Sequence, residues 1–361
     1  MTQPPYPTLN RMQPLKTLTD FIQSTDASCR LFDLGRRVSP LSSATFHRFE
    51  QATIPYPLPF MQQAWIGVLL WNPTQTTQQV IWFLKLPLDE QGLLVQAARD
   101  DFLNRLTRCV GNQLLQNAAE QDPLKDNPFA FTPDPEKMAA FHAQAGLILD
   151  QSASAFYQPS RDYLSGLRGY DDWQALGLQG IADICSRLDQ DCNDAVLSRA
   201  IEQLPLAPLD AFAAQLEHHA PSPALSQQLS RRLHRELETD NCAPGTIAAL
   251  LRGLSLSQRD ELRQGALWAV LESRYGSEVE VLAAIASRCW QELKDPALCS
   301  AFVEALSRNK AGQPCFNRIL ADLVFIPGMR PHIMSGLRNP ERSDHLAQAM
   351  GGFFGKLHSS D

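Results

Sequence analysis

The sequence lacks the short motifs that mark the commonest catalytic and nucleotide-binding sites. It contains no GxSxG nucleophile elbow, no GxxxxGK(S/T) phosphate loop, no GxGxxG dinucleotide fingerprint and no HExxH zinc motif. His234 and Glu236 have the HxE spacing of zinc deaminases, but the PCxxC partner is missing, so we interpret this segment as the solvated face of a helix. These absences favour a protein without a recognisable catalytic centre.

Paired cysteines are also lacking. The eight cysteines include no CxxC pair, so their spacing indicates neither a zinc site nor a thioredoxin-like redox site, and we expect no metal and no cofactor. We expect all of them to be reduced and most of them to be buried as small apolar side chains. Reduced thiols are typical of a cytoplasmic protein.

Basic charge and long apolar runs are scarce. The net charge of −7, from 32 basic and 39 acidic residues, argues against a protein that coats nucleic acid through its overall charge. The longest apolar run, 64–71, is far shorter than the roughly 20 residues that a membrane-spanning helix requires, and the N-terminus lacks the apolar core of a secretory signal. We therefore expect a cytoplasmic protein that makes no membrane contact.

Hydrophobic periodicity divides the chain into parts with different secondary structure. Residues 1–13 are proline-rich and are predicted to be a flexible tail. Residues 14–110 are predicted to be a small α+β domain, an antiparallel sheet with helices. Its clearest element is a β-hairpin formed by 65–71 and 80–86, with a long polar loop between them. The hairpin core is expected to include Trp65, Val68, Leu70, Ile81, Phe83 and Leu84.

The second half of the chain has helical periodicity throughout. A connector with one helix is predicted over 111–160, followed by a helical-repeat domain over 161–358. The predicted helix starts are 171, 193, 207, 222, 244, 257, 277, 295, 313, 328 and 343, and alternate starts recur at intervals of 33 to 37 residues. Because this interval is typical of two-helix repeats, we predict an all-α, HEAT-like solenoid.

Four segments carry a resemblance to a known family. They are Phe32-Asp-Leu-Gly-Arg36, the apolar hairpin from Trp65, Leu86-Pro-Leu-Asp-Glu-Gln-Gly92 and Cys315-Phe-Asn-Arg-Ile-Leu-Ala-Asp322. Together they resemble a bacterial protein family of unknown function and of similar length. The resemblance implies a bacterial protein and supplies no activity, cofactor or catalytic residue.

Two groups of residues are candidate binding surfaces. Aromatic and arginine side chains favoured at protein interfaces cluster in one segment, although they could instead fill a seam between domains; they are Tyr157, Arg161, Tyr163, Arg168, Tyr170 and Trp173. Residues 171–240 hold 12 acidic and 5 basic residues, whereas the end of the chain is basic. The candidate basic patch consists of Arg308, Lys310, Arg318, Arg330, Arg338 and Arg342.

Three functional hypotheses follow. The first is a non-catalytic scaffold whose solenoid binds an unknown protein partner. The second is an accessory factor that binds RNA through the basic patch. The third is an enzyme of unrecognised type, in which Asp89, Glu90 and the 157–173 cluster would share one pocket. The sequence does not determine the oligomeric state.

Overall fold

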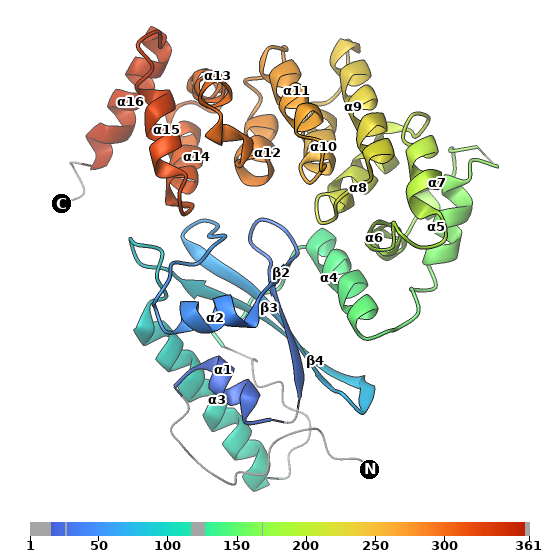
Figure 1. Cartoon of the computed structure of the whole chain (residues 1–361), viewed down its shortest axis with the longest axis vertical. Coiled ribbons are helices and arrows are strands. Elements are labelled where there is room, and N and C mark those ends of the chain that lie inside the picture. Colours follow the sequence, from blue (N-terminus) through green and yellow to red (C-terminus); the bar gives the residue numbers. More distant parts are fainter. Residues whose placement is uncertain (1–15, 26, 117–126, 168, 358–361) are drawn as a thin grey trace. The chain divides into compact units, whose positions relative to one another are not determined.

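The computed structural model of the chain describes residues 16–25, 27–116, 127–167 and 169–357 (Figure 1). The chain divides into two compact units, Met1–Lys137 and Met138–Asp361. The predicted flexible tail, 1–13, lies outside the described residues. Each unit is treated by itself below.

The first unit is built on a four-stranded antiparallel sheet. Its strands are β1 (Ser28–Asp33), β2 (Ser39–Leu41), β3 (Gln63–Asn72) and β4 (Gln75–Pro87), in the order β2-β1-β3-β4. The predicted hairpin is therefore confirmed, but the prediction of a long polar loop within it is wrong. The Asn72 carboxamide accepts hydrogen bonds from the main-chain N–H and the hydroxyl of Thr74, which closes a tight turn and lets the polar residues join β4.

One face of the sheet holds the core of this unit. Val68 pairs with Trp82 and Ile66 with Leu84 across β3 and β4, and all four side chains are buried on the same face. Helices α1 (Leu18–Gln23), α2 (Ser43–Glu50) and α3 (Gln96–Gln116) cover this face (Figure 1). The Phe21 ring of α1, for example, lies 6.3 Å from the Trp82 ring.

The opposite face of the sheet corrects part of the predicted core. Trp65, Ile81 and Phe83 are only half-buried, because the two-residue period of a strand places them on this second face. The segment 127–131 runs along β4 and covers part of the face: the Phe131 N–H donates to the Phe83 carbonyl over 3.1 Å. The Phe131 ring also meets the Trp65 ring edge-on at 4.8 Å.

The second unit consists of helices joined by short connections. The helices, of which α4 begins just before the boundary between the units, are α4 (Pro135–Ile148), α5 (Tyr157–Leu164), α6 (Leu178–Ser186), α7 (Asn193–Ala200), α8 (Leu206–Leu216), α9 (Pro223–Glu238), α10 (Pro244–Leu254), α11 (Asp260–Leu271), α12 (Val279–Arg288), α13 (Pro296–Ser307), α14 (Gln313–Phe325), α15 (Arg330–Leu337) and α16 (Asp344–Leu357). Among the described residues beyond Lys137 there is no strand. The mostly helical character predicted for this region is confirmed.

The predicted helix starts from 193 onward agree with the structure to within three residues, and local signals account for several of them. The hydroxyl of Ser222 accepts from the Leu225 N–H at the start of α9, and the carboxylate of Asp295 accepts from two N–H groups of α13. Proline occupies the first turn of five of these helices, α9, α10, α13, α14 and α15. The start predicted at 171 is wrong: a short 3-10 turn, Trp173–Ala175, lies there, and α6 begins at Leu178.

The helices of this unit contact one another in two rows (Figure 1). From α6 to α16, each even-numbered helix packs against the next even-numbered helix. From α5 to α15, each odd-numbered helix packs in the same way against the next odd-numbered helix. None of the helices that the structure describes is both long and apolar enough to cross a membrane.

Polar side chains also link neighbouring helices. Arg232 of α9 is buried and donates hydrogen bonds to the carbonyls of Ile201 (2.8 Å), Glu202 (2.9 Å) and Leu204 (2.9 Å), which follow α7. Its Nε donates to the Glu236 carboxylate over 2.7 Å. Since Glu236 is also buried, the interpretation of 234–236 as a solvated face is wrong for that residue.

Candidate functional site

The predicted aromatic and arginine cluster occupies α5 and the connection that follows it. Tyr157, Arg161 and Tyr163 lie on α5, and all three side chains are half-buried. Tyr163 donates to the main-chain carbonyl of Tyr170 over 3.0 Å, and the two rings meet edge-on at 5.4 Å. Trp173 has no ring contact with the other described aromatic residues, and Arg168 lies outside the described residues.

Tyr157 and Arg161 are fixed against the connection between α6 and α7. The Tyr157 hydroxyl donates to the Asp191 carboxylate over 2.8 Å and accepts from the Asn193 carboxamide over 2.7 Å. Burial raises the pKa of Tyr157, and the Asp191 carboxylate contributes to the same shift. Arg161 donates to the Asn193 side-chain oxygen (3.0 Å) and to the Asp191 carbonyl (2.7 Å), with its guanidinium 5.8 Å from the Tyr157 ring centre.

Three residues beside this cluster adopt left-handed backbone conformations, which only glycine adopts without strain. They are Asp150 (φ 53°), Asp191 (φ 50°) and Cys192 (φ 58°). Asp150 ends α4: the following N–H, of Gln151, reaches back to the Gly146 carbonyl over 2.8 Å, as in a Schellman cap. Aspartate tolerates this conformation better than most residues, but glycine is the usual choice.

These segments enclose a polar depression, which we name the Tyr157 pocket. Its cavity volume is about 350 Å³, and it is open to solvent on one side. Its lining comes from the end of α4, the start of α5 and the end of α6, and consists of Leu147, Asp150, Gln151, Ser152, Ala153, Tyr157, Arg187, Gln190 and Asp191. Every lining residue belongs to the helical unit.

Arg187 is the most buried charged residue of the Tyr157 pocket, with a side chain that is 5% exposed. Its Nη1 lies 3.2 Å from the Asp183 carboxylate and also donates to the Ser186 hydroxyl. Its Nη2 lies close to α4 at Gly146: a Cβ atom added to this glycine would be 3.8 Å from Nη2. Within the part of the chain that the structure describes, neither Nε nor Nη2 of Arg187 has a hydrogen-bond partner.

The stretch of chain from the end of α4 to the start of α7 exposes both apolar and acidic side chains. Leu167 is 89% exposed, Phe156 is 53% exposed and Ile148 is 37% exposed, three of the five large apolar side chains exposed in the described residues. The same stretch of chain also exposes six acidic residues: Asp150, Asp162, Asp171, Asp172, Asp189 and Asp191. We name these nine residues the acidic end surface.

Sequence reasoning found Tyr157 and Arg161 but missed Phe156, Leu167, Arg187 and the two left-handed aspartates. No sequence signal identified Arg187 or Asp191, because the pocket joins segments about 40 residues apart. Asp150 could have been noticed as a helix-ending residue where glycine is expected.

The predicted basic patch is exposed at all six positions: Arg308, Lys310, Arg318, Arg330, Arg338 and Arg342. Lys310 and Arg308 have acidic neighbours. Lys310 forms an ion pair with Glu278, and Arg308 lies 3.9 Å from Glu304. These contacts reduce the positive charge that the patch offers to a phosphate backbone.

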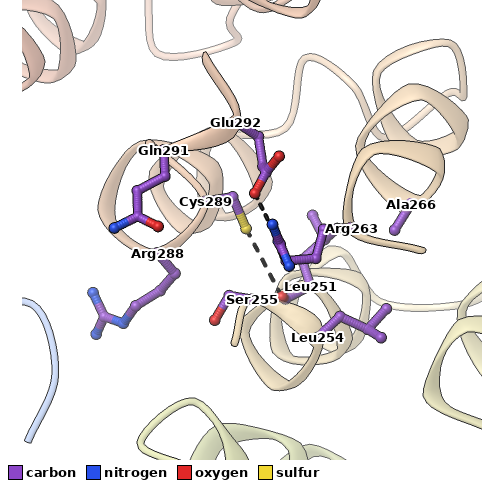
Figure 2. Close-up of a pocket in the computed structure, with 9 residues that line it drawn as sticks. All are labelled: Leu251, Leu254, Ser255, Arg263, Ala266, Arg288, Cys289, Gln291 and Glu292. Carbon is purple, nitrogen blue, oxygen red and sulfur yellow. Dashed lines mark hydrogen bonds and ion pairs between the residues drawn. The ribbon is translucent and has the colours of Figure 1, made fainter. Parts of the chain in front are cut away.

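A second, more enclosed pocket lies between α10, α11 and α12 and is too small for a ligand (Figure 2). It has room for about one water molecule. Arg263 donates to Glu292 across one side of it over 2.7 Å. Arg288 lies at its edge and forms hydrogen bonds of 2.7 and 3.0 Å with the Glu217 carboxylate. Burial opposes ionisation of Glu217, but this arginine, His218 and Arg252 together hold its pKa well below the usual range.

The Phe32–Arg36 segment of the first unit forms a buried polar network. The Asp33 carboxylate accepts from the Tyr56 hydroxyl over 2.8 Å and from the Arg36 main-chain N–H over 3.3 Å. Arg36 is 1% exposed, and its Nε donates to the Pro59 carbonyl over 3.0 Å. Gly35 lacks the Cβ atom that would lie 3.0 Å from Phe60, so this segment packs closely against the loop before β3.

Asp89 and Glu90, which the enzyme hypothesis requires, lie in the first unit. The Asp89 carboxylate accepts from the main-chain N–H groups of Gln91 and Leu93, both over 2.9 Å, and thereby holds its own turn. Among the described residues, no group of three or more histidine, cysteine, aspartate or glutamate side chains is placed to hold a metal ion.

Comparison with known proteins gives a family but no described activity. No curated protein and no solved structure matches the chain. One family model, described as "Protein of unknown function (DUF3549)", matches residues 13–354. This range includes all four segments that carry the resemblance, and the chain therefore belongs to that family.

Proposed function

We propose that the protein is a non-catalytic interaction protein whose helical unit is a HEAT-like solenoid. The contacts of each helix with the next but one support this proposal, because stacked helix pairs bury one continuous core between two rows. Such arrays commonly offer their outer surfaces and ends to a protein partner. In this chain, the acidic end surface is the proposed docking site.

The observation that carries the proposal is the exposure of Phe156 and Leu167 in a stretch of chain that also exposes several aspartates. Large apolar side chains in water cost free energy, roughly 25 cal/mol for each Å² that remains exposed. Apolar anchors surrounded by charged residues are typical of protein interfaces. The surrounding acidic residues favour a partner with a basic surface, since complementary charge accelerates association.

Photo-crosslinking in the native cell tests this proposal. A photoreactive phenylalanine analogue replaces Tyr163, and crosslinked proteins are identified by mass spectrometry with and without the change Leu167→Asp. We expect one major product, reduced at least tenfold by Leu167→Asp, because a buried unpaired charge disfavours the interface. Leu206→Asp is the matched control, since Leu206 is a 38% exposed leucine on α8, outside the acidic end surface.

Two results would contradict the proposal. One is that no crosslinked protein depends on Leu167. The other is that the control change reduces the product as strongly as Leu167→Asp does.

RNA binding through the basic patch is a second candidate, favoured by the exposure of all six cations. An RNA ligand should lose affinity steeply with salt, and each phosphate contact removed should lower the slope of log K against log salt by about 0.7 to 0.9. We expect RNA binding no tighter than about 10 to 100 µM at physiological salt, the non-specific range. Submicromolar binding that is lost when Arg308, Arg318, Arg330 and Arg338 are all changed to glutamate would make this the leading function.

A further inference from the structure

We infer that the Tyr157 pocket binds an arginine or lysine residue of the partner polypeptide. The main-chain carbonyl of that residue accepts hydrogen bonds from Arg187, and its side-chain cation lies between Asp150 and Asp191. This inference rests on the proposed function, because it assigns a chemical identity to the segment that docks on the acidic end surface.

Arg187 supplies the hydrogen-bond donors. A guanidinium has five N–H groups, and only those on Nη1 of Arg187 have partners among the described residues. Nε and Nη2 are not among the buried side-chain atoms that lack a partner, so solvent reaches them and an incoming carbonyl can take its place. Asp183 already balances the charge of this arginine, which makes a neutral carbonyl a sufficient ligand.

Asp150 and Asp191 supply the site for the cation. The Asp150 carboxylate has neither a hydrogen bond nor an ion pair in the described part of the chain. The Asp191 carboxylate accepts from Tyr157 through Oδ2 and has no cationic partner among the same residues. Two carboxylates without cationic partners favour a guanidinium or ammonium group.

Both of these aspartates have a left-handed backbone. Glycine at φ near 50° would relieve local strain, yet an acidic side chain occupies both positions. The Asp150 carboxylate is not needed to form its turn, because the main-chain hydrogen bonds of Asp150 and Gln151 close the end of α4. The Asp150 side chain is therefore available to bind a ligand.

Size and charge restrict the class of ligand. The cavity volume of about 350 Å³ lies within the 300 to 1,000 Å³ usual for binding pockets and accommodates a long basic side chain. A phosphate group is disfavoured, because Asp150 and Asp191 would repel it while Asp183 already neutralises Arg187.

The test uses the full chain and the blocked peptide Ac-Gly-Gly-Arg-Gly-Gly-NH2, observed by saturation-transfer difference NMR. We expect saturation transfer to the arginine methylenes and a dissociation constant in the millimolar range or below. The peptide with citrulline in place of arginine should bind at least fivefold more weakly, because citrulline is a neutral isostere.

The variants Asp150→Asn and Arg187→Lys separate the two halves of the site. Each variant should weaken binding of the arginine peptide at least fivefold. Arg187→Lys should also weaken binding of the citrulline peptide, because it removes the donors to the peptide carbonyl. Asp172→Asn is the matched control, since Asp172 is exposed and its side chain makes no capping hydrogen bond. Circular dichroism verifies that each variant is folded. If Arg187→Lys does not fold, the result for Asp150→Asn decides the test.

Three outcomes would overturn the inference: no saturation transfer from the chain to the arginine peptide, equal binding of the citrulline peptide, or unchanged binding by Asp150→Asn. Binding of free arginine without binding of the blocked peptide would also overturn it and would indicate an amino-acid site. These failures are distinguishable from failure of the proposed function, because Leu167→Asp would still abolish the crosslinked product if a partner docks without using the pocket.

Discussion

Changing Arg232 to methionine should lower the free energy of unfolding of the helical unit by about 3 to 5 kcal/mol. The magnitude follows from what the guanidinium holds: three main-chain carbonyls after α7 and the buried carboxylate of Glu236. Without Arg232, Glu236 becomes an uncompensated buried charge. Methionine has a similar length and is apolar, so loss of packing contributes little.

Arg235→Met is the matched control, three residues further along α9. The Arg235 side chain is 48% exposed, lies 3.5 Å from Glu236 and donates one hydrogen bond to the Glu202 carbonyl. An exposed contact of this kind contributes about 0.2 to 1 kcal/mol. The double variant Arg232→Met with Glu236→Met should recover part of the loss, because it removes the unpaired charge as well.

Urea denaturation followed by circular dichroism measures the total effect, and hydrogen exchange with mass spectrometry locates it. We expect faster exchange in α7, α9 and the segment between α7 and α8, where the freed carbonyls lie. A loss below about 1 kcal/mol in Arg232→Met, or one equal to that of Arg235→Met, would refute the idea that this arginine joins neighbouring helices.

Three further predictions concern single residues. Val68→Asp should cost several kcal/mol in denaturant melts, because Val68 is fully buried opposite Trp82, and full stability in this variant would contradict the assigned core. Asp150→Gly should leave the melting temperature unchanged or raise stability by up to about 1 kcal/mol, and a clear loss would show that the carboxylate stabilises the turn. Burial raises the pKa of Asp33 to about 6 despite its hydrogen bonds from Tyr56 and Arg36. Between about pH 4 and 6 the unfolded chain therefore releases a proton that the folded chain keeps, and stability should fall by about 2 to 3 kcal/mol as the pH rises through this window. Urea melts at pH 4, 5, 6 and 7 with wild type and Asp33→Asn measure this dependence, which should be weaker in the variant.

Local sequence signals were sufficient to predict most of the secondary structure. The starts of α9, α10, α13, α14 and α15 were predictable because caps and prolines act on neighbouring residues only. The hairpin was predictable because β-branched and aromatic runs favour strands. The short strand β2 was missed, since it depends on pairing with β1 that local composition does not encode. The tight turn at Asn72 was missed although its signal is local, an asparagine side chain that accepts hydrogen bonds from the residue two positions later.

Tertiary packing decided everything that required residues distant in sequence to meet. It buried Arg232 and Glu236 on a helix face that looks solvated in the sequence, because the carbonyls after α7 lie 28 to 31 positions earlier in the chain. It also brought Asp150 and Tyr157 beside Arg187 and Asp191, and left Nε and Nη2 of that arginine without a partner among the described residues. Periodicity reports which residues share a face of one helix, whereas a pocket depends on which turns of different helices come into contact.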